Sequence, residues 1–204
     1  MKLFYSPGAC SLATHIVALE AGSPATYEKV DLRAKKTESG ADFMQINPKG
    51  YVPALQLDSG DILTEVSAVI QYLAHQAPGS GLMPEAGTPE HFRVLEWIGF
   101  ISAELHKGFG PLFNPATPDA YKTIAIANLN RRLAYLNEVL DGRSYLVGDR
   151  FTVADAYLFT ILRWTGPMKI DMAGLGNVAA YMDRVGNRER VRQALVNEGL
   201  LKAA

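Results

Sequence analysis

The sequence predicts an α+β chain made of two unlike halves, and three observations support this prediction. Strand and helix signals alternate through the first 78 residues, only helical signals follow, and a segment rich in proline and glycine lies between them. We therefore expect one domain over residues 1–80 and an all-helical domain over residues 88–204. A length of 204 residues, with 48% apolar and 20% charged residues, fits a globular chain of this organisation.

Short apolar runs and helical periodicity give the first half the order βαβ, then α, then ββα. The expected strands are residues 2–5, 27–31, 51–57 and 61–63, and the expected helices are residues 11–20, 41–46 and 64–77. In the first of these helices, Leu12, Ile16 and Leu19 share one face, and Gly22 is expected to end it. Residues 33–40 contain lysine, serine and glycine and are expected to form a loop.

Helix start signals divide the second half. Thr88-Pro89-Glu90 combines a cap, a proline at the first helical position and an acid in the first turn. The apolar residues that follow it at helical spacing are Phe92, Leu95, Ile98, Ile101, Leu105 and Phe109. Thr117-Pro118-Asp119 repeats the signal, and the apolar residues after it are Ile124, Leu129, Leu133, Leu136 and Leu140.

Two further helices are expected near the end of the chain. Thr152 and Asp155 have the spacing of a capping box, with Asp in place of the usual Glu or Gln. The helix that they open, over residues 153–164, is almost wholly apolar and should be buried at the centre of its domain. A last helix is expected over residues 181–198.

Composition argues against several classes of function. A net charge of −1 disfavours a general nucleic-acid or anionic-membrane surface. No apolar run approaches the roughly 18 residues that span a bilayer, and the N-terminus lacks the long apolar region of a signal peptide. The four histidines are dispersed, and a single cysteine rules out thiolate clusters, so no metal site is expected. A lone cysteine also fits a reducing compartment, so we expect a cytoplasmic protein.

That lone cysteine, Cys10, lies between a predicted strand and a predicted helix. A helix N-terminus stabilises anions, so a thiol there should have a lowered pKa and act as a nucleophile. The alternative is a small buried apolar side chain, because free cysteine is among the most buried residue types. The strand–turn–helix setting favours reactivity.

Two features lie near the later strands of the first half. Pro53 stands at the start of a predicted strand, and a cis bond after Val52 would expose the Val52 backbone to a ligand. From the residues alone a trans bond is favoured, since about 5% of X–Pro bonds are cis. Glu65 opens the next helix, either as a favourable charge on the helix dipole or as an acceptor for a ligand's ammonium group.

His106 is the candidate of the second half. In an α-helix it would share a face with Gly99, Ala103 and Gly110. These small residues either leave a hollow around the histidine or only allow close helix packing, and the two interpretations are equally supported. The residues alone do not show that Cys10 and His106 meet as a nucleophile and base.

Taken together, five segments make the chain resemble the bacterial beta-class glutathione S-transferases over essentially its full length. They are residues 2–11, residues 47–53 (Asn-Pro-Lys-Gly-Tyr-Val-Pro), Thr64-Glu65, Glu104-Leu105-His106-Lys107 with Pro111-Leu112-Phe113, and residues 148–155. The resemblance implies a thioredoxin-like βαβαββα domain over residues 1–80, followed by the family's all-helical domain. It also implies glutathione as co-substrate, a small hydrophobic electrophile as acceptor, a role in detoxification and a homodimer.

The resemblance also assigns site residues. Cys10 and His106 match residues near the glutathione sulfur and are the expected catalytic pair. Val52, before a cis-proline matching Pro53, would pair with the cysteinyl backbone of glutathione. The other matched glutathione-binding residues are Lys35, Glu65, Val66, Glu104 and Lys107, with Glu104 and Lys107 partly supplied by the neighbouring subunit.

The chain departs from this family pattern at three positions at or near the matched site. Val66 replaces a common glycine, Gly99 a common asparagine, and Ala103 a common serine or threonine. The last two remove side-chain hydrogen bonds, so we expect glutathione binding about tenfold weaker than in a typical relative.

Three functions fit these residues. The first is transfer of glutathione to an electrophile, with possible peroxidase activity. The second is monothiol disulfide exchange through Cys10, because a thiolate can attack a disulfide sulfur. The third is a non-catalytic protein of the same fold that binds ligands or proteins.

Overall fold

The computed structural model describes residues 1–202 and contains two compact units. The first comprises Met1–Met83 together with Asn187–Ala204, and the second comprises Pro84–Gly186. The segment that begins at Asn187 thus groups with the first unit, although the sequence places it in the helical half. The division into independently folding domains at residues 1–80 and 88–204 stays a prediction.

A five-stranded mixed sheet forms the centre of the first unit. Its strands, in spatial order, are β3 (Lys36–Thr37), β2 (Thr26–Asp31), β1 (Lys2–Tyr5), β4 (Ala54–Gln56) and β5 (Ile62–Thr64). β1 runs parallel to β2, and the other neighbouring pairs are antiparallel. Leu3 and Phe4 are both buried although successive side chains of a strand point to opposite faces, so the central strand is covered on both sides.

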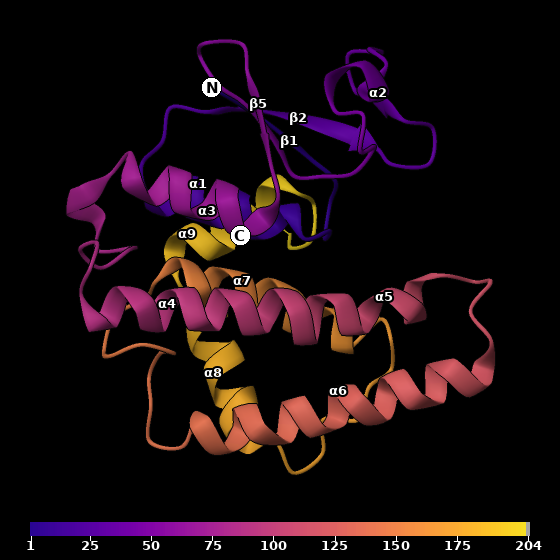
Figure 1. Ribbon diagram of the computed structural model, residues 1–204, viewed down its shortest axis with the longest axis vertical. Helices are drawn as coiled ribbons and strands as arrows, with labels where there is room; N and C mark the ends of the chain where they lie inside the picture. The colour runs from indigo at the N-terminus through magenta and orange to yellow at the C-terminus, as the bar shows by residue number, and fades with distance from the viewer. Residues whose placement is uncertain (203–204) are drawn as a thin grey trace. The chain divides into compact units, whose positions relative to one another are not determined.

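Three helices cover the sheet of the first unit (Figure 1). Helices α1 (Ser11–Glu20) and α3 (Val66–His75) pack against each other on one face. The short helix α2 (Phe43–Ile46) covers the other face, where Phe43 lies 5.9 Å from the Phe4 ring. The predicted bounds of β1 and α1 are confirmed, and the other expected elements of this half occur within a few residues of their predicted positions.

One strand of this sheet was not expected. Residues 33–40 were predicted to be a loop, but they contain β3, which pairs Lys36 with Asp31 and Thr37 with Val30. The pairing is too short to show a periodic pattern, and its polar composition resembles that of a loop. The prediction for this segment was therefore wrong in part.

The predicted last helix over residues 181–198 is also wrong. Two helices occupy this region, α8 (Gly176–Gly186) in the second unit and α9 (Glu189–Asn197) in the first. Between them Arg188 has an extended backbone, with φ −64° and ψ 138°. Its guanidinium forms hydrogen bonds of 2.7 and 2.9 Å with the Glu20 carboxylate at the end of α1, and this pair holds the chain where the helix breaks.

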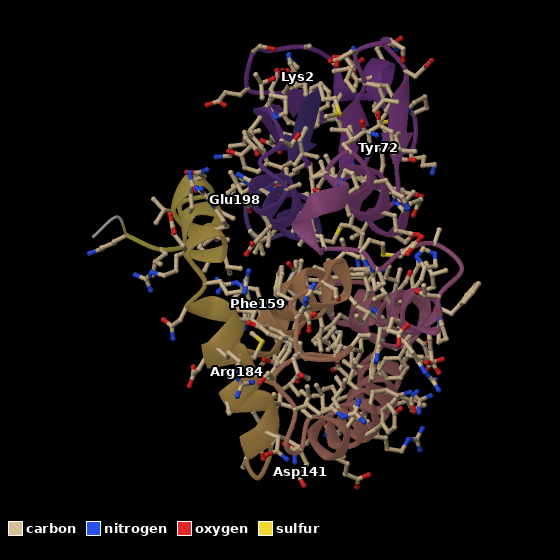
Figure 2. The ribbon with its side chains drawn as sticks, turned by 90° about the vertical axis from the view of Figure 1, so that its left-hand side faces the viewer. Lys2, Tyr72, Asp141, Phe159, Arg184 and Glu198 are labelled. Atoms are coloured by element: carbon tan, nitrogen blue, oxygen red, sulfur yellow. The ribbon has the colours of Figure 1, made fainter. Side chains whose placement is uncertain are left out.

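The C-terminal segment contacts the region that precedes Cys10. Figure 2 shows Glu198 at the end of α9, a helix that packs on α1. One Glu198 carboxylate oxygen accepts a hydrogen bond from the Gly8 N–H at 2.9 Å, and the other lies 3.0 Å from Nδ1 of the buried His15. These contacts fix the turn between β1 and α1 from a distant part of the sequence.

The helical segments of the second unit are α4 (Pro89–Phe100), the π-helical segment η2 (Ile101–His106), α5 (Lys107–Phe113), α6 (Asp119–Val139), α7 (Val153–Leu162), the 3₁₀ turn η3 (Arg163–Thr165) and α8. The start signal of α4 is confirmed, since the Thr88 hydroxyl accepts from the His91 N–H at 3.2 Å. Phe92 and Ile124 do not belong to the buried stripes, being 60% and 55% exposed.

Helix α7 is buried along its whole length and contacts α4, η2 and α8, as its apolar sequence predicted. The capping box at its start is confirmed. The Asp155 carboxylate accepts from the Leu146 N–H at 3.0 Å, the Thr152 N–H at 2.8 Å, the Thr152 hydroxyl and the Tyr181 hydroxyl. The box therefore joins α7 to α8 and to the preceding loop.

Among residues 1–202, no helix has both the length and the apolar character needed to cross a bilayer. The same residues contain no group of three or more histidine, cysteine, aspartate or glutamate side chains arranged to hold a metal ion.

Candidate active site

Cys10 occupies the N-cap position of α1, as its sequence context predicted. Its thiol donates a hydrogen bond to the carbonyl oxygen of Val52, with an Sγ–O distance of 3.2 Å. The predicted low pKa is wrong for the ligand-free protein. Burial raises the pKa of the Cys10 thiol to about 12, outweighing the hydrogen bonds from the backbone N–H groups of Cys10 and Ser11, which lower it. Cys10 is therefore a thiol donor here, not a thiolate.

Three successive backbone carbonyls around Val52 each accept a hydrogen bond from a side chain. The pairs are Lys35 Nζ to Gly50 O at 2.6 Å, Asn47 Nδ2 to Tyr51 O at 2.7 Å, and Cys10 Sγ to Val52 O at 3.2 Å. Asn47 is 2% exposed, so its hydrogen bond is made inside the protein. The backbone of residues 50–52 is thus held at every carbonyl, as a segment that pairs with a ligand's backbone would need.

The bond between Val52 and Pro53 is cis. The family resemblance predicted this, whereas the trans bond favoured from the residues alone is wrong. The sequence could not decide the matter locally because the neighbours that surround this bond, including Cys10, come from elsewhere in the chain.

Glu65 lies at the N-cap position of α3 with φ 72° and ψ 125°, a backbone conformation that is unusual for a residue with a side chain. Its carboxylate accepts from Lys49 Nζ at 2.7 Å and from the Tyr51 hydroxyl at 3.3 Å. Val66, the first residue of α3, is buried. The Glu65 carboxylate is thus placed where it receives an ammonium group, although here that group belongs to the protein.

The second unit brings His106 together with aromatic residues. His106 Nδ1 lies 2.7 Å from the hydroxyl oxygen of Tyr157, and the imidazole meets the Trp164 ring edge-on with centroids 5.1 Å apart. Phe109 and Phe113 contact the same indole, at 5.7 and 5.0 Å. These three aromatic residues therefore form one cluster beside the histidine.

Glu104 and Lys107, the other candidates of this unit, are exposed. The Glu104 carboxylate forms an ion pair with Arg132 of α6, at 2.6 Å from one guanidinium nitrogen and 2.8 Å from Nε. Of the two interpretations of the small residues near His106, an enclosed hollow is not found within this unit, because Gly99, Ala103 and Gly110 are all exposed.

Comparisons with known proteins agree with this geometry. The glutathione S-transferase N-terminal domain model matches residues 8–76, and the C-terminal domain model matches residues 100–189. Glutathione S-transferase GstA of Escherichia coli O157:H7 is 48% identical over 200 residues, which cover 98% of this chain and 100% of that protein. The chain belongs to the glutathione S-transferase family.

Solved structures refine the class of this glutathione S-transferase. A sphingomonad glutathione S-transferase complexed with glutathione is 47% identical with a TM-score of 0.94. The bacterial beta-class enzyme of Sphingomonas chungbukensis is 44% identical with a TM-score of 0.95. Each alignment covers 98% of this chain and 100% of the other. The chain is thus a beta-class transferase with a thioredoxin-like N-terminal domain and a helical C-terminal domain, and the alternative of a non-catalytic protein is not supported.

Sequence reasoning missed four residues of the transferase that hold the candidates in place. They are Asn47, Lys49, Arg132 and Tyr157. Asn47 and Lys49 stood inside a motif that carried the resemblance, but their partners could not be identified from spacing. The sequence did indicate Tyr157 in one respect, because it places a hydroxyl in a helix that is otherwise almost wholly apolar. A buried hydroxyl needs a hydrogen-bond partner.

Proposed function

We propose that this transferase joins the sulfur of glutathione to small hydrophobic electrophiles. The observation that carries the proposal is the protonated Cys10 thiol, hydrogen-bonded to a carbonyl of a segment held at residues 50–52. A thiol donor beside the cysteinyl part of bound glutathione would stabilise the glutathione thiolate, because a charge-assisted hydrogen bond favours the charged form. The glutathione sulfur, not Cys10, is then the nucleophile.

The reaction proceeds by one bond exchange. The glutathione thiol releases its proton to solvent, and a sulfur lone pair forms a bond to the electrophilic carbon. In a substitution, the leaving group departs with the electron pair of the bond that breaks. In a conjugate addition, the π electron pair of the acceptor shifts away from that carbon and is protonated by solvent. His106 supplies a second polar group for the sulfur, and Phe109, Phe113 and Trp164 supply apolar surface for the acceptor.

We assign glutathione binding to the residues that the resemblance indicated: Cys10, Lys35, Val52, Pro53, Glu65, Val66, Glu104, His106 and Lys107. The backbone of Val52 would pair with the cysteinyl unit, and Lys35 would face the carboxylate at the opposite end from the γ-glutamyl group. The Lys49 ammonium on Glu65 supports the γ-glutamyl assignment, because the same carboxylate could take the amino group of glutathione. The exposed position of Glu104 and Lys107 is compatible with a homodimer in which they serve the neighbouring subunit. We further propose that the enzyme is cytoplasmic and acts in detoxification.

Disulfide exchange or peroxidase activity through Cys10 is the second candidate, favoured by the position of Cys10 at a helix N-terminus. The high pKa of this thiol in the ligand-free protein opposes it, because the thiolate is the attacking species. We therefore rank conjugation first.

A paired assay tests the proposal on wild type, Cys10→Ala and Cys10→Ser. One reaction gives glutathione with an aromatic electrophile, and the other gives glutathione with a small mixed disulfide. We expect wild type to be active in conjugation, Cys10→Ser to retain much of this activity through its hydroxyl donor, and Cys10→Ala to lose more. Conjugation that is absent from the folded wild type, or equal in all three proteins, would contradict the proposed role of Cys10. Exchange that disappears in both variants would establish the second activity.

We also expect glutathione binding to tighten about tenfold when Gly99→Asn and Ala103→Ser are combined, since each restores a polar side chain worth roughly 0.5–1.5 kcal/mol. A Cβ added at Gly99 meets no atom within 4 Å, so the first substitution has room. Calorimetric titration with glutathione measures the change. An unchanged affinity in the double variant would show that these departures do not weaken the site.

A further inference from the structure

His106 has a hydrogen-bond partner to which the proposed function gives no role. Tyr157, on α7, places its hydroxyl oxygen 2.7 Å from His106 Nδ1, and the two rings stand perpendicular with centroids 5.8 Å apart. Tyr157 is 1% exposed, and η2 contacts α7 along the chain segments that carry both residues. Because Tyr157 is buried, packing holds its hydroxyl at the imidazole.

Trp164 also contacts the imidazole. The indole meets the His106 ring edge-on, with centroids 5.1 Å apart, and is itself packed by Phe109 and Phe113. A ring that is hydrogen-bonded at Nδ1 and packed against an indole has less freedom to rotate than a solvated one.

The backbone at His106 has an unusual form. Residues Ile101–His106 form a π-helical segment between α4 and α5, in which the Lys107 N–H bonds to the Ser102 carbonyl, five residues earlier. Such segments are rare and occur frequently at functional sites. Because each π turn holds more than the 3.6 residues of an α turn, the segment changes the direction in which His106 leaves the helix. The face predicted from α-helical spacing therefore does not describe this histidine.

We propose that Tyr157 is a positioning residue for the transferase reaction: its hydroxyl donates to His106 Nδ1 and holds the imidazole in the tautomer that carries its proton on Nε2. A phenol keeps its proton near neutral pH, and a neutral imidazole has one accepting nitrogen, so this pairing suits both groups. Nε2–H is then the group that donates to the anionic sulfur of glutathione. The inference rests on the role proposed above for His106.

The test combines NMR with kinetics on the full-length enzyme. Two-bond ¹H–¹⁵N spectra at pH 8 report the tautomer of each histidine, and the His106→Asn variant assigns the His106 signals among the four histidines. We expect the Nε2–H tautomer in wild type and a loss of this preference in Tyr157→Phe. In the same variant, kcat for conjugation should fall about threefold to tenfold while the KM for glutathione changes less than twofold.

A matched control separates positioning from general stability. Tyr181→Phe removes another buried hydroxyl of the same unit, the one that bonds to Asp155, and should lower the unfolding temperature without moving the His106 signals or kcat. An Nδ1–H tautomer in wild type, or a Tyr157→Phe variant with unchanged tautomer and kcat, overturns the inference. An unchanged kcat in His106→Asn would contradict the proposed role of His106, and with it the role of Tyr157. A kcat that is lowered in His106→Asn but not in Tyr157→Phe would contradict only the role of Tyr157.

Discussion

At pH 8, Cys10 of the ligand-free enzyme is expected to react with iodoacetamide about a hundredfold more slowly than a small model thiol. Burial raises the pKa of Cys10 to about 12, so roughly one molecule in 10⁴ carries the thiolate at this pH, against about a quarter of an ordinary thiol. The greater nucleophilicity of a high-pKa thiolate recovers part of this difference. Mass spectrometry measures the rate directly, because Cys10 is the only cysteine of the chain.

The pH dependence of the same reaction distinguishes a buried thiol from a reactive thiolate. With a raised pKa, the rate should increase about tenfold per pH unit from pH 7 to pH 10. A thiol activated by the helix N-terminus would instead reach a constant rate near or below neutral pH, and that result would show that burial does not dominate. The urea-unfolded protein is the control, since its Cys10 should titrate like a model thiol.

The error in the predicted pKa of Cys10 shows where sequence reasoning ends. The helix N-terminus that lowers the pKa is local, and it could be identified from the strand–turn–helix pattern around Cys10. Burial, which raises the pKa more, depends on packing that a local pattern does not describe. The Val52 carbonyl that accepts from the thiol, for example, lies 42 residues along the chain. No periodicity reports that contact.

The same division applies to the fold. Helix α1 was predicted at its observed bounds from local periodicity, yet one apolar face was expected and residues 11–18 are buried on all sides. Helix α9, which comes from the other end of the chain, packs on α1 in addition to the neighbouring α3 and β1, and a local pattern does not report this contact. The break that separates α8 from α9 depends likewise on the distant pair of Arg188 and Glu20.

For the candidate site, the sequence indicated where the residues lie in helices and strands better than it indicated which residues they contact. Glu65 was placed correctly at the start of a helix, but its contact with Lys49 depends on how a loop folds beside it. His106 was singled out on an α-helical face that the π-helical segment does not preserve. Its partner Tyr157 lies 51 residues away on a helix that was recognised only as apolar.

The largest effect on stability is expected at the capping box of α7. Asp155→Ala should lower the free energy of unfolding by about 3–5 kcal/mol and the melting temperature by roughly 10 °C. The substitution leaves two backbone N–H groups, of Leu146 and Thr152, and the hydroxyl of Tyr181 without their shared acceptor. Burial, with the Asp155 charge as a smaller contribution, raises the pKa of Tyr181 well above its ordinary value, so this hydroxyl stays a donor that needs an acceptor.

Two further variants separate the capping box from a general sensitivity of this region, with urea or thermal unfolding as the measurement. Asp149→Ala removes an exposed carboxylate six residues earlier and should change stability by less than about 0.5 kcal/mol. Thr152→Ala keeps the Asp155 carboxylate and its contacts with Leu146 and Tyr181, so it should cost about 1–2 kcal/mol, the usual value of a cap. Equal losses from Asp155→Ala and Thr152→Ala would mean that the cap alone matters. A larger loss from Asp155→Ala would mean that this carboxylate joins α7, α8 and the preceding loop, because only its removal breaks all three connections.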